Sequence, residues 1–156
     1  MAELKDRLRS DLTAAMKSRD VLRASTLRMA LTAVTNAEVS GKRARELDDD
    51  EVTRVLVSEA KKRREAAEAY AGAGRAELAD KERAEAAVLA DYLPQPLTDD
   101  ELAALVTAAV QQAGVAGEGM KAMGKVMGAL RPQVAGRADG GVVAAEVRRQ
   151  LGVAAR

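Results

Sequence analysis

The 156-residue sequence contains no cysteine and no histidine, and these two absences exclude several classes of chemistry. Without thiols the chain has no disulfide and no cysteine nucleophile, and without either residue it has no zinc site of the Cys/His type. Acid–base catalysis would fall to carboxylates or lysines, because no imidazole is present. We therefore expect no catalytic residue, no metal and no cofactor.

Long apolar runs are also missing. The longest stretch without a charged residue, 102–117, contains glutamine and glycine and is typical of a helix and loop in a water-soluble protein. The N-terminal segment MAELKDRLRSD alternates in charge and has no apolar signal-peptide core. These features predict a cytoplasmic protein with no membrane association.

Aromatic residues are nearly absent, since Tyr70 and Tyr92 are the only ones. Base-stacking platforms of the kind used by single-strand binders are therefore not expected. The net charge is +1, and acids and bases balance within residues 1–92. In residues 121–137, however, every charged residue is basic. This modest basic stripe consists of Lys121, Lys125, Arg131 and Arg137.

Two segments, LDDDEV and LTDDEL, carry the same helix-start signal. Asp48 followed by Glu51, and Thr98 followed by Glu101, have the spacing of a capping box, with flanking apolar residues in place for a hydrophobic staple. Both segments predict the start of a helix.

The segment YLPQPL precedes the second of these helices. Pro94 and Pro96 exclude a continuous helix there and favour extended backbone. We place a domain boundary at this point, with an N-terminal domain over 1–93 and a C-terminal domain over 94–156, and we expect the two to be separable.

Apolar spacing predicts helices throughout, and no window alternates at the period of a strand. We expect an all-α protein in which an N-terminal helical bundle is joined to a small C-terminal three-helix domain. The first helix has a narrow apolar stripe ending at Met16, and the second, over 21–39, has a wider apolar arc that includes Met29 and predicts a central position. The next expected helix runs from about Asp49 past Tyr70 and stops near the segment AGAGR. The others cover about 76–92, 99–112 and 119–130, and the last runs from Gly140 or Gly141 to Leu151.

The segment MGKVMGALRPQVAGRADGG places glycines inside an expected helix, which Pro132 is expected to close. A 100° step per residue divides its residues between two faces. The core face contains Met120, Met123, Val126, Met127 and Leu130. The opposite face contains Lys121, Gly124, Lys125, Gly128 and Arg131.

Glycines spaced by four residues allow another backbone to approach, and the neighbouring cations favour an anion such as a nucleic-acid phosphate. Alternatively, a neighbouring helix packs on the glycines and the lysines extend along its edges. Likewise, the turn at Gly136 and Arg137 either offers an anion site at the next helix N-terminus or is closed by Asp139 as an N-cap. The spacing leaves both choices open.

Two other segments have simpler interpretations. The basic run KKRR, residues 61–64, is distributed around a helix and neutralised by nearby glutamates, which favours a solvated face with i,i+4 pairs. The segment GAGRAE follows no strand, so it does not indicate a dinucleotide site.

Three segments resemble the YqeY family: LRASTLRMALTAV, the stretch from AKKRREAAEAY to YLPQPLTDDEL, and MGKVMGALRPQVAGRADGG. The resemblance covers nearly the whole chain. The C-terminal half also resembles the tail domain of GatB, the subunit of the glutamine-dependent amidotransferase that acts on misacylated tRNA. The resemblance implies an N-terminal helical lobe joined to a small helical domain associated with tRNA recognition.

The GatB resemblance carries a family label of carbon–nitrogen ligase with glutamine as amido donor. The large catalytic domain of GatB has no counterpart in this chain, so we expect no catalysis by the protein alone. The matching motif positions are Gly124, Lys125, Gly128, Gly136, Arg137, Asp139 and Gly140. Ala135 and Gly141 stand where lysines are common in the family pattern.

The leading hypothesis is a tRNA-associated adaptor, a monomer whose partners are tRNA and proteins of tRNA metabolism. The alternative is a helical protein–protein module whose glycines receive a partner helix, and a third hypothesis is an assisting amidotransferase. The candidate nucleic-acid-binding residues are Lys121, Gly124, Lys125, Gly128, Arg131, Gly136 and Arg137.

Overall fold

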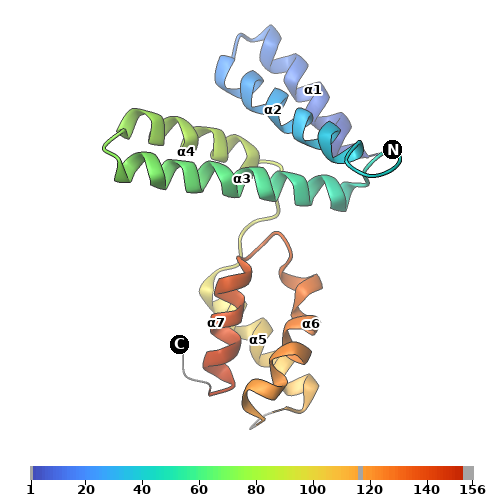
Figure 1. Cartoon of the computed structure of the whole chain (residues 1–156), viewed down its shortest axis with the longest axis vertical. Helices are drawn as coiled ribbons and strands as arrows, with labels where there is room; N and C mark the ends of the chain where they lie inside the picture. Colours follow the sequence, from blue (N-terminus) through green and yellow to red (C-terminus); the bar gives the residue numbers. More distant parts are fainter. Residues whose placement is uncertain (1, 116–117, 153–156) are drawn as a thin grey trace. The chain divides into compact units, whose positions relative to one another are not determined.

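The structure is a computed structural model, and it describes residues 2–115 and 118–152. Within these residues the only regular elements are helices, which confirms the predicted all-α class. The chain divides into two compact units, Met1–Leu93 and Pro94–Arg156, which are described separately below (Figure 1).

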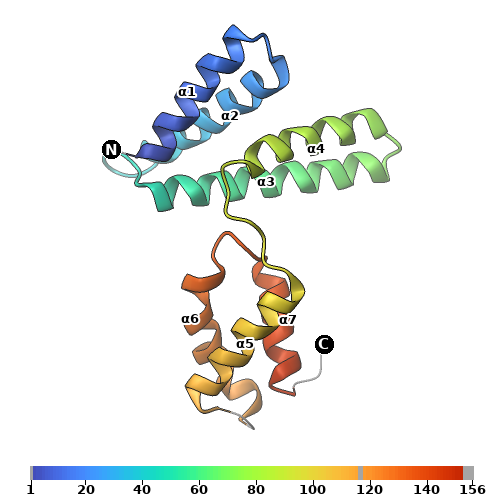
Figure 2. The same cartoon turned by 180° about the vertical axis from the view of Figure 1, so that it is seen from behind.

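The first unit consists of α1 (Glu3–Lys17), α2 (Val21–Glu38), α3 (Asp49–Gly72) and α4 (Ala76–Ala90). Consecutive helices form two hairpins, α1 with α2 and α3 with α4, as both views show (Figure 2). Helix α2 packs against the other three helices, as expected for a central element, and α3 does so as well. The main core contains Ala2, Leu8, Leu27, Ala30, Val34, Leu47, Val52, Leu56, Ala60, Val88, Leu89 and Tyr92.

Two methionines expected in the apolar stripes lie at the surface instead. Met16 is 48% exposed and Met29 is 44% exposed. Their sulfur atoms each lie 3.4 Å from an arginine nitrogen, on Arg28 and Arg63 respectively. A thioether tolerates such a mixed environment, so apolar spacing alone overestimated the width of both buried faces.

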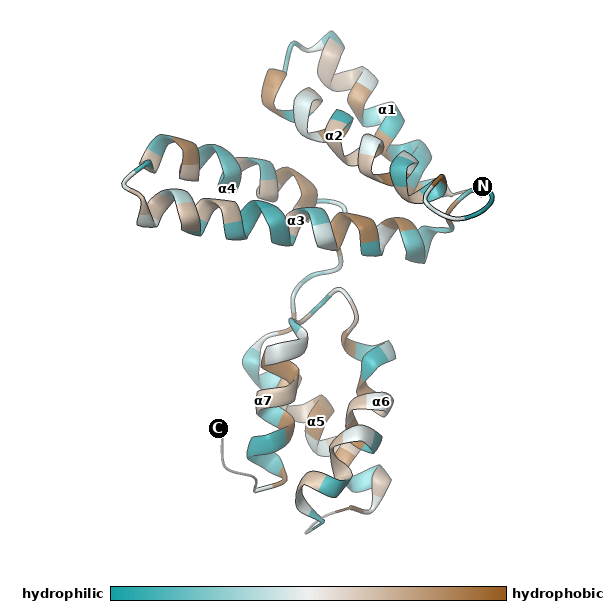
Figure 3. Cartoon of the chain, viewed as in Figure 1, coloured by the Kyte–Doolittle hydropathy of each residue, from teal (hydrophilic) through white to brown (hydrophobic). Residues whose placement is uncertain are grey.

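Charged side chains are buried at two places in this unit. Lys5 donates to Glu38 at 2.6 Å, and the same carboxylate accepts from the backbone of Leu47. Arg63 of the KKRR run lies 3.1 Å from Glu85 on α4. The other three residues of the run are exposed, so the predicted solvated face is confirmed for them only. Hydrophilic and hydrophobic residues alternate along the α3 ribbon (Figure 3).

The second unit consists of α5 (Asp99–Ala113), a 3₁₀ turn η1 (Gly119–Ala122), α6 (Met123–Val134) and α7 (Gly140–Gln150). The three α-helices pack against one another. Their core contains Leu102, Val106, Ala109, Val115, Ala122, Val126, Leu130, Val134, Val143, Val147 and Leu151.

Pro132 does not close α6, contrary to the expectation, because the helix continues to Val134. Proline removes the hydrogen bond to the carbonyl four residues earlier, and its ring crowds that carbonyl. That carbonyl belongs to Gly128, which is exposed and therefore open to water. The helix can thus contain the proline without leaving a buried carbonyl unpaired.

The predicted capping box of α3 is present in full. Asp48 accepts from the backbone of Glu51, and Glu51 accepts in return from the backbone of Asp48. Arg45 also donates to both carboxylate oxygens of Glu51. The hydrogen bonds from Arg45, followed by the one from Asp48, lower the pKa of Glu51 from 4.5 to about 2.

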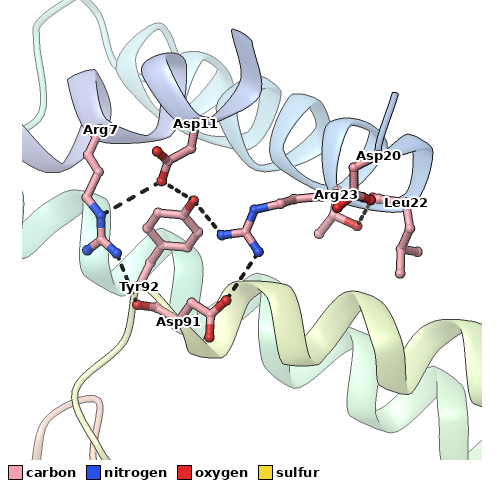
Figure 4. Close-up of polar contacts among 8 residues, drawn as sticks. Arg7, Asp11, Asp20, Leu22, Arg23, Asp91 and Tyr92 are labelled. Carbon is pink, nitrogen blue, oxygen red and sulfur yellow. Dashed lines mark hydrogen bonds and ion pairs between the residues drawn. The ribbon is translucent and has the colours of Figure 1, made fainter. Parts of the chain in front are cut away.

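A polar cluster holds the residues that directly follow α4, Asp91 and Tyr92, against α1 and α2 (Figure 4). The hydroxyl of Tyr92 donates to Asp11 at 2.5 Å and accepts from Arg23 at 3.3 Å. Arg23 also pairs with Asp91, while Arg7 lies over the tyrosine ring, 4.6 Å from its centroid. Burial, and then the hydrogen bond to Asp11, raise the pKa of Tyr92. The cluster therefore keeps a protonated hydroxyl as donor.

The two cores predict separate unfolding of the two units. Both tyrosines lie in the first unit, whereas both units contribute to the far-UV circular dichroism signal. In a urea titration we expect the tyrosine fluorescence and circular dichroism transitions to differ, because the smaller second core should unfold at lower urea. Coincident transitions would show that the two units unfold as one.

Replacing Tyr92 by Phe should destabilise the first unit by about 1–2 kcal/mol, because a buried hydroxyl loses a charged acceptor. Tyr70→Phe is the matched control, since Tyr70 is exposed and its hydroxyl makes no hydrogen bond with the described residues. The measurement is the urea unfolding free energy by circular dichroism. Equal stability of the two variants would show that the Tyr92 hydroxyl is not a structural anchor.

Glu51→Gln should destabilise the first unit at pH 7, and the difference from the wild type should shrink as the pH falls from 4.5 towards 2. A lowered folded-state pKa gives stabilisation that is present above the unfolded-state value and is lost as the carboxylate becomes protonated. Glutamine keeps the return bond of the capping box, so the variant removes only the charge. The check is the urea midpoint at pH 7 and pH 2.5, with exposed Glu46→Gln as control. A difference independent of pH would contradict this account.

Candidate nucleic-acid interface

Helix α6 has one buried face and one open face. Val126, Leu130 and Val134 are buried, whereas Gly124, Lys125, Gly128 and Arg131 are exposed. The sequence pattern therefore predicted the orientation of this helix correctly. We call the exposed surface formed by Gly124, Lys125, Gly128 and Arg131 the α6 face.

The pattern fails at the start of the segment. Met120, expected on the core face, is 58% exposed, and Ala122 is buried in its place. Residues Gly119–Ala122 form a 3₁₀ turn, which advances about 120° per residue rather than 100°. The helical phase therefore cannot be extended back from α6 to Met120 or Lys121.

The two glycines of the α6 face are not required by the fold. A Cβ atom built on Gly124 or Gly128 would meet no neighbouring atom within 4 Å among the described residues. Neither glycine has the positive φ that would exclude a side chain. Each costs about 1 kcal/mol of helix stability relative to alanine. The idea that a helix of the same chain packs on these glycines is therefore wrong for the part of the chain that the structure describes.

The cations near the α6 face differ in their contacts. Lys121 and Arg131 are exposed, and neither side chain forms a hydrogen bond or ion pair with any described residue. Lys125 donates to the backbone carbonyl of Ala113 at 3.3 Å. Ala113 is the last residue of α5, where unpaired carbonyls and the negative end of the helix dipole favour a cation.

Arg137 lies at the other end of α5. Its Nε donates to the carbonyl of Gln95 at 3.0 Å, and its Nη2 lies 3.7 Å from the carboxylate of Glu101. Helix α5 has 15 residues and so spans about 20 Å, which separates this contact from the one that Lys125 makes. The structure therefore does not bring all the predicted cations into one patch.

The turn before α7 is capped from within the chain. Gly136 has a φ of +73°, which allows the sharp turn after α6. Asp139 accepts from the backbone of Gly141 and so occupies a donor at the N-terminus of α7. Of the two alternatives for this turn, the capped one is confirmed.

The reciprocal capping box expected at α5 forms only in part. Thr98 accepts from the backbone of Glu101 as predicted. The Glu101 carboxylate lies beside Arg137 instead of bonding back to Thr98. Sequence analysis had no signal for this pairing, because the partners are 36 residues apart and meet only when α5 and the turn after α6 pack together.

The described residues offer little other chemistry. They contain no group of three or more acidic residues placed to hold a metal ion. In addition, no described helix combines the length and apolar character needed to cross a membrane. The α6 face is therefore the candidate functional site, because its two glycines lower helix stability and have no role in the described fold.

Comparison with protein-family models gave a match over most of the chain. A search of the curated proteins found no similar protein. The model of a protein family, described as Yqey-like protein, matches residues 5–151, which include helices of both compact units. The chain therefore belongs to the Yqey-like protein family.

Proposed function

We propose that this protein is a non-catalytic adaptor of tRNA metabolism that binds the tRNA backbone with the α6 face. The observation that carries the proposal is the pair of glycines at 124 and 128. They lower helix stability, and neither internal packing nor backbone conformation requires them. Two positions without a side chain, one helical turn apart on the same face, let a ligand approach the helix backbone closely.

The charge of the surface favours an anionic ligand. Arg131 and Lys125 flank the glycines on opposite sides, and Lys121 precedes them in η1. Cations without internal partners, such as Lys121 and Arg131, can contact phosphates without first breaking an ion pair. No acidic residue occurs between Lys121 and Arg137, so nothing along this segment repels a phosphate.

The composition supports contact with the backbone rather than with bases. Residues 94–156 contain no aromatic side chain, so this unit offers no stacking platform for unpaired bases. Phosphate contacts position a protein on nucleic acid without reading its sequence. The resemblance of MGKVMGALRPQVAGRADGG to the GatB tail domain supports tRNA as the nucleic acid.

Gly136 and Arg137 have a smaller part in this proposal than the sequence motif implied. Arg137 already bonds Gln95 and lies beside Glu101. A phosphate there would compete with the carboxylates of Glu101 and Asp139. We therefore assign phosphate contact to Lys121, Lys125 and Arg131.

The alternative is that the α6 face receives a helix of a partner protein. The four-residue spacing of the glycines favours it as well, because small residues at this spacing allow two helices to approach closely. A partner helix needs the glycines, whereas a tRNA backbone needs both the glycines and the cations. This difference separates the two functions experimentally.

Gly128→Leu should reduce tRNA affinity by at least about tenfold without lowering the melting temperature. Leucine blocks the approach to the helix, yet its Cβ would meet no neighbouring atom of the described residues within 4 Å, and leucine raises helix propensity relative to glycine. The measurements are fluorescence anisotropy with labelled tRNA and thermal unfolding by circular dichroism. Gly128→Ala is the matched control and should keep most of the affinity.

Arg131→Ala in the same assay should weaken binding and reduce the salt slope by about one unit or less per lost phosphate contact. Arg149→Ala on α7 is the control, because Arg149 is paired with Glu146. If tRNA affinity is unchanged in both Gly128→Leu and Arg131→Ala, the tRNA proposal is wrong and the partner-helix alternative is left.

A further inference from the structure

The segment that connects the two units is held at its first end by the first unit. Leu93 donates its backbone N–H to Ala90 at 3.1 Å, and its side chain packs against the first core. The preceding residue, Tyr92, is fixed by Asp11 and Arg23 (Figure 4). The chain is therefore anchored up to Leu93.

The other end of the segment is held by Arg137 of the second unit. The guanidinium Nε donates to the carbonyl of Gln95 at 3.0 Å, and the backbone N–H of Leu97 donates to the carbonyl of Arg137 at 2.9 Å. We call these two hydrogen bonds the Arg137 clamp. The side chain of Leu97 packs against the second core, and Glu101 lies 3.7 Å from the same guanidinium.

The turn after α6 explains how one residue can make both bonds. Gly136, with a φ of +73°, reverses the chain direction, and the N–H of Arg137 then bonds the carbonyl of Val134. These contacts fix the Arg137 backbone, so its carbonyl can accept from Leu97 while its side chain reaches Gln95. The planar guanidinium suits this task because its N–H groups point in fixed directions.

Pro94 is left between the two anchored ends. The proline ring fixes φ of Pro94, and residues that precede a proline are restricted to extended backbone. This restriction applies to both Leu93 and Gln95. Few soft torsions are therefore left in the connection.

We propose that Arg137 is a positioning residue of the inter-unit connection, because its clamp fixes Gln95, Pro96 and Leu97 to the second unit in solution. With the clamp in place, Pro94 is the only residue of the connection that neither core holds. Without it, the unanchored segment would extend from Pro94 to Leu97. The proposal is independent of the tRNA proposal, since it concerns contacts within the chain.

The test is backbone amide dynamics of the full-length protein by NMR. In the wild type, the ¹⁵N heteronuclear NOE of Gln95 and Leu97 should equal that of residues in the middle of α5. In Arg137→Ala the value for Gln95 should fall towards that of a mobile loop. The Leu97 amide keeps its bond to the backbone carbonyl of residue 137, but the bond between the Arg137 side chain and Gln95 is lost. Hydrogen exchange of the Leu97 amide should therefore become about three- to tenfold faster.

Arg131→Ala is the matched control, because it removes an exposed arginine of the same unit that has no partner among the described residues. Unchanged chemical shifts of Val126 and Leu130 would show that the second core is intact. If Arg137→Ala does not fold, Arg137→Lys is used, since one ammonium group cannot reproduce the guanidinium geometry. Its NOE at Gln95 should fall as well.

Two results would overturn the proposal. One is a mobile Gln95 in the wild type, which would mean that the clamp does not hold in solution. The other is an Arg137 variant, folded and with an unchanged NOE at Gln95. The two proposals are tested separately. Loss of tRNA affinity in Gly128→Leu supports the tRNA proposal, whereas a rigid Gln95 in the wild type supports the clamp.

Discussion

The architecture depends on Pro94 and Pro96, which interrupt an otherwise helical chain. Each proline lacks a backbone donor and disfavours helical conformation in the residue before it. Helix α4 therefore ends near Ala90, and α5 must start again with its own cap at Thr98. As a result, the helices on each side bury their apolar faces among themselves, and the chain has two cores instead of one.

Four glycines of the second unit illustrate two different physical situations. Gly114 and Gly136 have positive φ values, so the turns at these positions need glycine. Gly124 and Gly128 are helical and face open space within the described residues. The backbone conformation of the turns explains why Gly114 and Gly136 are glycines. For Gly124 and Gly128 the fold gives no such reason, and we propose that contact with a ligand explains them.

Three arginine side chains connect parts of the chain that are distant in the sequence. Arg23 links α2 to the end of α4, Arg63 links α3 to α4, and Arg137 links the turn after α6 to the segment before α5. Such side chains are unavailable for an external anion unless these contacts break. The basic residues that stand out in a sequence are therefore not equivalent as candidates for phosphate binding.

The sequence by itself determined the helices, their caps at Asp48, Thr98 and Asp139, and the buried face of α6. These features depend on residues within one or two helical turns, so local spacing is sufficient to predict them. Only the tertiary structure decided that Met29 is exposed, that Lys5 is buried beside Glu38, and that Arg137 bonds Gln95. The two hydrogen-bonded pairs, Lys5 with Glu38 and Arg137 with Gln95, join residues that are 33 and 42 positions apart. No local pattern encodes which distant side chains meet when helices pack.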